Sequence, residues 1–127
     1  MESKQPLEYK LQVRICRGEK FFGPGVAQLM QLIDQHHSLH KATEEMHIAY
    51  SKAWRILKEA QKNIGFEIIH KTVGGSGGGG SVLTEEGREY LQRYLAFEQE
   101  LRKEADRLFQ KYFLDFEQNQ SNLQQHF

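Results

Sequence analysis

Apolar and polar residues alternate along the first part of the chain, from Leu7 to Cys16. An alternation with a period of two predicts a half-buried strand, because successive side chains of a strand point to opposite faces. Residues 17–20 place a glycine among charged side chains, which predicts a turn after this strand. The inward row of the strand is apolar and consists of Leu7, Tyr9, Leu11, Val13 and Ile15.

Three segments with helical periodicity follow. Residues 24–37 place four apolar side chains on one helical face, namely Val26, Leu29, Met30 and Ile33. A second, short helix begins after Ser38, a preferred N-cap residue, and ends near Met46. A third helix spans residues 50–63, and its apolar face consists of Ala53, Ile56, Leu57 and Ala60.

A β-hairpin and a long helix complete the chain. Residues 66–73 are rich in β-forming side chains, and residues 81–83 predict a short returning strand after a glycine-rich segment. The last helix begins after Thr84 and ends near Phe116, with acidic residues in its first turn, where the helix dipole favours them. The glutamine-rich residues 117–127 are expected to fray.

The order of these elements is strand, three helices, hairpin and long helix. Three helices followed by a β-hairpin form the winged helix-turn-helix arrangement, in which the second helix of the motif lies in the major groove of DNA. We therefore predict a mainly α fold with a small β component, consisting of a winged helix-turn-helix with an N-terminal strand and a long C-terminal helix.

The third predicted helix is the candidate reading helix. His47 stands in the preceding turn where glycine is usual, and histidine tolerates a left-handed backbone better than most residues. Arg55 can form two hydrogen bonds with guanine, and its neighbours can contact bases or phosphates. A surface helix with ordinary solvated charges is the competing interpretation. The predicted DNA-binding residues of the helical part are Ser38, Tyr50, Ser51, Lys52, Arg55 and Lys62.

The glycine-rich segment predicts a wing that approaches phosphate, because glycines let backbone amides come close with no side chain between. A phosphate-binding P-loop is excluded, since the glycines lead into Ser-Val-Leu and not into Gly-Lys-Ser before a helix. A flexible spacer or an engineered linker would have the same composition. The predicted DNA-binding residues of the wing are Lys71, Gly74, Gly75, Ser76, Gly77 and Gly78.

Three motifs between about residues 21 and 101 resemble the N-terminal DNA-binding domain of the molybdate-responsive regulators, the ModE family. That domain is itself similar to the DNA-binding part of LysR-type regulators. The resembling motifs are Ser-Lys-Ala-Trp at 51–54, Thr-Val-Gly-Gly-Ser-Gly-Gly-Gly-Gly-Ser-Val-Leu-Thr at 72–84 and Glu-Gly at 86–87.

The resemblance carries several implications. It implies that the glycines are native, and that Tyr50, Ser51, Lys52 and the wing contact DNA. It also implies that Trp54 is an anchor of helix packing. Family members continue into paired molybdate-binding domains, whereas this sequence ends at Phe127. We therefore expect neither a ligand-binding domain nor molybdate sensing in this chain.

The last predicted helix is longer than a domain of this size requires. Its apolar residues recur at steps near 3.5, and such a stripe needs a partner. A homodimer is the simplest partner and suits two-fold DNA sites, and the resembling family also dimerises through this region. The alternative is that the stripe packs on the first strand. The predicted dimerisation residues are Leu91, Tyr94, Leu95, Leu101, Ala105, Leu108 and Tyr112.

The predicted organisation is a DNA-binding domain over residues 1–84, a dimerisation helix over 85–116 and a flexible tail over 117–127. The whole chain has 17 basic and 17 acidic residues, but residues 38–81 hold six basic against four acidic. Residues 82–127 hold six basic against nine acidic. A mildly basic middle and an acidic end suit a protein with one surface turned toward phosphate.

The remaining chemistry points away from catalysis. The single cysteine, Cys16, excludes an intramolecular disulfide, and no apolar run is long enough to cross a membrane, so we predict a cytoplasmic protein. No metal-binding or catalytic motif is present, so we predict no enzyme activity and no cofactor. The predicted function is a homodimeric, sequence-specific regulator that binds double-stranded DNA. A protein-interaction module, suggested by the zero net charge, and a ligand or metal sensor are the alternatives.

Overall fold

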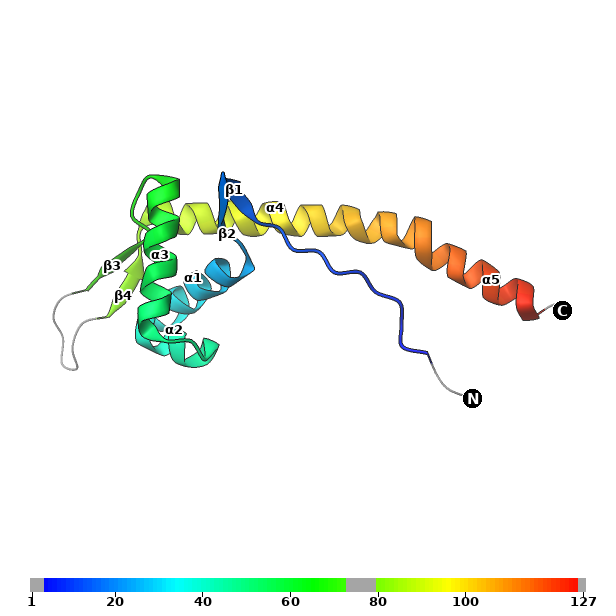
Figure 1. Cartoon of the computed structure of the whole chain (residues 1–127), viewed down its shortest axis with the longest axis horizontal. Helices are drawn as coiled ribbons and strands as arrows, with labels where there is room; N and C mark the ends of the chain where they lie inside the picture. The colour runs from blue at the N-terminus through cyan, green and yellow to red at the C-terminus, as the bar shows by residue number, and fades with distance from the viewer. Residues whose placement is uncertain (1–3, 73–79, 126–127) are drawn as a thin grey trace. The chain divides into compact units, whose positions relative to one another are not determined.

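A computed structural model describes residues 4–72 and 80–125 (Figure 1). The chain divides into two compact units, one over residues 12–96 and the other over residues 1–11 and 97–127. Among the described residues, the first unit contains two short antiparallel hairpins, three helices and the start of a longer fourth helix. The predicted class, a mainly α winged helix with a small β component, is confirmed.

The N-terminal strand is much shorter than the alternating pattern predicted. Strand β1 covers only Ile15–Arg17 and pairs with β2, Glu19–Phe22, around Gly18, whose φ is +77°. The residues before β1 have no neighbouring strand, and a side chain takes the place of a strand partner. The hydroxyl of Tyr94 donates a hydrogen bond of 2.7 Å to the carbonyl of Val13. Of the predicted inward row, Val13 is buried, Tyr9, Leu11 and Ile15 are half-buried, and Leu7 is 46% exposed. The alternation therefore predicted a longer strand and a more completely buried row than the structure has.

The three helices of the motif begin and end as their sequences predict. Helix α1 spans Pro24–His36, α2 spans Leu39–Met46 and α3 spans Tyr50–Ile64. Ser38 caps α2, because its Oγ accepts a hydrogen bond of 3.1 Å from the backbone N–H of Lys41. His47 ends α2 with φ 57°, which confirms the left-handed backbone predicted for this turn. The turn therefore keeps the geometry of the motif without glycine.

The described part of the wing is the antiparallel pair of β3, Ile69–Lys71, and β4, Ser81–Leu83 (Figure 1). Its base is seated on the end of α1: the N–H of Ser81 donates a hydrogen bond of 3.0 Å to the carbonyl of His37. Gly80 is required at this contact, since a Cβ there would lie 2.6 Å from the same carbonyl oxygen. The close backbone approach therefore fixes where the wing leaves the helices.

The core of this unit extends into the first turns of α4, Glu85–Phe109. Leu91 and Tyr94 are buried, and the ring of Phe22 lies 4.9 Å from that of Tyr90 and 5.0 Å from that of Tyr94, measured between centroids. Two residues predicted for dimerisation, Leu91 and Tyr94, therefore pack inside their own chain. Because their surface is already covered, they are removed from the proposed dimer surface.

The second unit contains the later part of α4, a π-helical turn η1, Gln110–Leu114, and α5, Asp115–Gln125. The helical segment therefore continues past residue 116, where the sequence predicted its end. The hydroxyl of Tyr9 donates a hydrogen bond to the carbonyl of Arg102, and Arg102 Nη2 donates one of 3.0 Å to the carbonyl of Leu11. This part of α4 therefore contacts residues 9–11, which the alternative prediction had placed in the first strand, but these residues form no strand here.

Candidate nucleic-acid interface

Helix α3 presents one face to the core and the opposite face to solvent. Ala53, Leu57 and Ala60 are fully buried, and they recur at the spacing of a single helical face. The predicted contact residues Tyr50, Ser51, Lys52, Arg55 and Lys62 are all exposed. The structure therefore brings the predicted residues of α3 to one solvent-facing side of a rigid helix.

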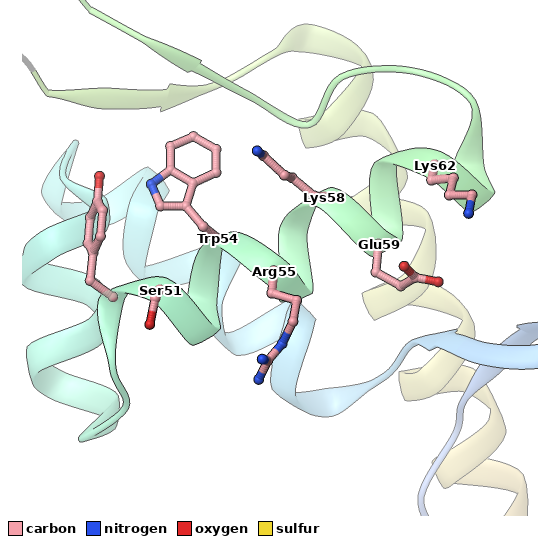
Figure 2. Close-up of a pocket in the computed structure, with 7 residues that line it drawn as sticks. Ser51, Trp54, Arg55, Lys58, Glu59 and Lys62 are labelled. Carbon is pink, nitrogen blue, oxygen red and sulfur yellow. The ribbon is translucent and has the colours of Figure 1, made fainter.

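This face is hollowed, with a volume of about 570 Å³ (Figure 2). In Figure 2, Trp54 and Lys58 point toward the wing side of the helix, whereas Ser51 and Arg55 point to the other side. The lining includes two residues that the sequence analysis did not select as DNA contacts, Trp54 and Lys58. The sequence could have predicted both residues, because Trp54 and Lys58 follow Tyr50 at steps of four and therefore share its helical face. The residues that line the hollow are Tyr50, Ser51, Trp54, Arg55, Lys58, Glu59 and Lys62.

Trp54 joins the helix to the wing. The resemblance implied a packing anchor inside the helices, but the indole is only half-buried and lies on the hollowed face. The ammonium group of Lys71 lies 5.2 Å from the centroid of the Trp54 ring, within the range of a cation–π contact. The Tyr50 ring meets the indole edge-on at 6.3 Å between centroids. Lys71 of β3 therefore stands over α3, and an exposed contact of this kind contributes about 0.5–1 kcal/mol.

The cations of α3 lack the partners that neutralise the arginines of α4. Within residues 4–72 and 80–125, Lys52, Arg55, Lys58 and Lys62 make no hydrogen bond or ion pair through their side chains. By contrast, four arginines of α4 pair with carboxylates: Arg88 with Asp34, Arg93 with Glu89, Arg102 with Glu98 and Arg107 with Glu104. The four cations of α3 are therefore available to an external anion, whereas these four arginines of α4 are not.

These ion pairs also shift the pKa values of their members. The hydrogen bond to Asp34 raises the pKa of Arg88, and the hydrogen bond from Arg107 lowers the pKa of Glu104. Each shift favours the charged form of its group. Both members of each pair are charged at neutral pH, so each pair has no net charge.

The remaining predicted residues fall in different places. Ser38 lies at the start of α2, and its hydroxyl is already used by the cap. Lys71 lies on β3, above Trp54. Five predicted wing residues lie outside the described residues, namely Gly74, Gly75, Ser76, Gly77 and Gly78.

Other kinds of site receive no support from the described part of the chain. No group of three or more His, Cys, Asp or Glu side chains there is close enough to hold a metal ion. His36, His40 and His70 each lie near a glutamate, and Cys16 is exposed. No helix among the described residues is sufficiently long and apolar to span a membrane.

The fold and the helix with unpaired cations define a winged helix-turn-helix protein. No protein-family model matches the chain. The chain is similar to the "DNA-binding transcriptional dual regulator ModE" of Escherichia coli K12, with 29% identity over 74% of this chain. It is also similar to the "Molybdenum transport protein ModE" of Azotobacter vinelandii, with 29% identity over 66% of the chain, and to the "Transcriptional regulator ModE" of Haemophilus influenzae, with 30% over 58%.

The chain spans about a third of the length of the curated relatives it matches, namely 34%, 31% and 29% of these three proteins. The match lies in the N-terminal part of those proteins. The resemblance seen in the sequence motifs is therefore confirmed as a similarity to the N-terminal part of proteins named ModE.

Proposed function

We propose that this chain is a transcription regulator that binds duplex DNA through α3 and the wing. The observation that carries the proposal is the set of unpaired cations on the exposed side chains of α3, in contrast to the α4 arginines, which are neutralised by carboxylates. Relatives that match the same region are named DNA-binding or transcriptional regulators. Lys and Arg side chains without internal partners are free to replace the counterions of phosphate.

The outward residues of α3 divide into two proposed roles. Ser51, Lys52 and Arg55 belong to the first half of the helix, which in helix-turn-helix proteins contacts the base edges. Arg55 would read guanine through O6 and N7, whereas Lys58 and Lys62 would contact phosphates. Lys71 and the predicted wing glycines would add phosphate contacts beside them. Specificity would then rest on a few side chains and affinity on the remainder.

We also propose that the chain binds DNA as a homodimer. The later part of α4 and the segments after it expose large apolar side chains, with Leu101 and Leu108 each 38% exposed and Tyr112 60%. A hollow of about 500 Å³ lies against this surface and includes Tyr9 and Ala105. Exposed apolar surface of this kind marks a protein contact. The proposed dimer surface retains Leu95, Leu101, Ala105, Leu108 and Tyr112.

The base-reading role is tested with Arg55→Ala. We expect the variant to lose about 1–3 kcal/mol of affinity for a selected duplex and much less for random duplex of the same length. Lys62→Ala, at the other end of the same face, is the matched control and should weaken both duplexes similarly. Equal losses on both duplexes for Arg55→Ala would assign Arg55 to phosphate contact, and no loss on either would contradict the proposed interface.

The dimer is tested by sedimentation of Leu108→Lys, with Gln99→Lys as the control at an exposed polar position of α4. A buried ammonium group would disfavour association, so Leu108→Lys should sediment as a monomer at concentrations where the control is dimeric. Monomeric wild-type protein would remove the dimer from the proposal. Monomeric protein that still binds duplex DNA would leave the α3 interface in place.

A further inference from the structure

A second cavity, of about 760 Å³, lies in the same unit beside the proposed DNA-binding helix. Its walls come from the β1–β2 hairpin, the start of α1, the turn between α2 and α3, and α3 itself. The lining includes four half-buried apolar side chains, namely Val26, Met46, Ile48 and Ile56. This volume falls within the range of small-molecule sites, about 300–1,000 Å³, and the lining is apolar as such sites are.

The rim of the cavity carries an excess of positive charge. Four basic side chains line it, Arg14, Lys20, Lys52 and Arg55, against two acidic ones, Glu19 and Glu59. Within the described residues, Lys20, Lys52 and Arg55 have no internal ion-pair partner, and the Nη2 of Arg14 donates only to the amide oxygen of Gln12, at 2.7 Å. An apolar interior below such a rim complements a ligand with an apolar body and one anionic end.

The start of α1 adds to the complementarity. Helix α1 opens at this cavity without a side-chain cap at Gly23 and without an acidic residue in its first turn. Uncapped N–H groups at a helix start favour negative charge. Gly25 leaves space here, because nothing lies within 4 Å of the position where its Cβ would be. The anionic end of a ligand would therefore meet both side-chain cations and backbone donors.

We propose that this cavity binds a small amphipathic organic anion, with an aromatic or aliphatic body and a single carboxylate or sulfonate. Lys52 and Arg55 belong both to the cavity rim and to the proposed DNA contacts. A bound anion would hold these two side chains in the cavity rim and offset part of their positive charge, so binding of the ligand and binding of DNA would oppose each other. The competition between the anion and DNA rests on the proposed function. Binding of the anion itself requires only the cavity.

The probe for the test is 1-anilinonaphthalene-8-sulfonate, which has an aromatic body and one sulfonate and fluoresces when it leaves water. Gly25→Leu fills the cavity from the open side of α1, and Gln35→Leu, at an exposed position of the same helix, is the matched control. We expect Gly25→Leu to weaken the probe by about tenfold or more, because it occupies the apolar volume. Gln35→Leu should bind as wild type, although it adds the same side chain. Equal affinity of Gly25→Leu and wild type overturns the proposal.

Lys20→Gln tests the charge of the rim without touching the helices. It should weaken the sulfonate probe about threefold or more and leave the uncharged dye Nile red unchanged, since one ion contact of a partly exposed site is removed. Equal weakening of both dyes overturns the anionic part of the proposal. If Gly25→Leu changes the sedimentation of the protein and not its affinity for the probe, the cavity receives a second copy of the chain, which also overturns the proposal.

Competition with DNA separates this inference from the proposed function. Probe at a concentration just sufficient to saturate wild type should lower the affinity for duplex DNA in wild type and in Gln35→Leu, but much less in Gly25→Leu. Probe binding that depends on Gly25 in a protein that does not bind DNA would support the cavity and contradict the proposed function. If the protein binds DNA but its affinity for the probe does not depend on Gly25, the proposed function is supported and the cavity proposal is contradicted.

Discussion

Substitution of glycine by alanine is expected to have opposite effects on stability at Gly80, where the wing contacts the end of α1, and at Gly25 in α1. At Gly80 a Cβ would lie 2.6 Å from the carbonyl oxygen of His37, and at Gly25 it would meet nothing within 4 Å. Gly80→Ala must displace the start of β4, which endangers the 3.0 Å hydrogen bond from Ser81 to His37 and the 2.8 Å bond from the N–H of Gly80 to Thr72. Leaving such a group unpaired costs about 1–3 kcal/mol, so we expect a loss of stability of that size.

Gly25→Ala replaces glycine in a helix without a steric conflict and should stabilise the protein by about 0.5–1 kcal/mol. Urea unfolding followed by circular dichroism measures both changes. With an m-value of about 2 kcal/mol per M, Gly80→Ala should lower the midpoint by about 0.5–1.5 M, whereas Gly25→Ala should raise it. An unchanged or raised midpoint for Gly80→Ala would refute the contact between the wing and the His37 carbonyl.

Two further predictions follow from the same unit. His47→Gly should raise the free energy of unfolding by about 0.5–1 kcal/mol, because φ of 57° is strained for histidine and free for glycine, and a lower urea midpoint would contradict this. A double-mutant cycle between Trp54→Ala and Lys71→Ala should give a coupling of about 0.5–1 kcal/mol from the 5.2 Å cation–π contact, and additive effects in urea unfolding would show that the wing is not tied to α3.

Local signals in the sequence were sufficient for the helices of the motif. Ser38 predicted the start of α2 because its hydroxyl satisfies a free N–H of the first turn, and His47 predicted the left-handed turn. The apolar face of α3 was predicted correctly, because a period of 3.6 residues separates one face from the other. These features depend on neighbours within a few residues in the chain, which is why the sequence reports them.

Features that depend on distant partners were not predicted. The alternating N-terminal residues resembled a strand, but a strand needs a paired neighbour, and here the hydroxyl of Tyr94 binds the carbonyl of Val13. Leu91 and Tyr94 fit a dimer stripe equally well as core positions, because periodicity shows that a face is covered and not what covers it. The same limit applied to Trp54, whose partner Lys71 lies on another element.

The central claim is that the unpaired cations of α3 and the wing bind the phosphates of duplex DNA. The most direct measurement is the affinity for a selected duplex across a salt series. If the three cations assigned to phosphates, Lys58, Lys62 and Lys71, contact them in each bound chain, log K should fall linearly with log salt concentration, with a slope of about −3 per chain. Lys62→Ala should reduce the slope by about one. An affinity that does not change with salt, or no measurable binding at low salt, would contradict the account.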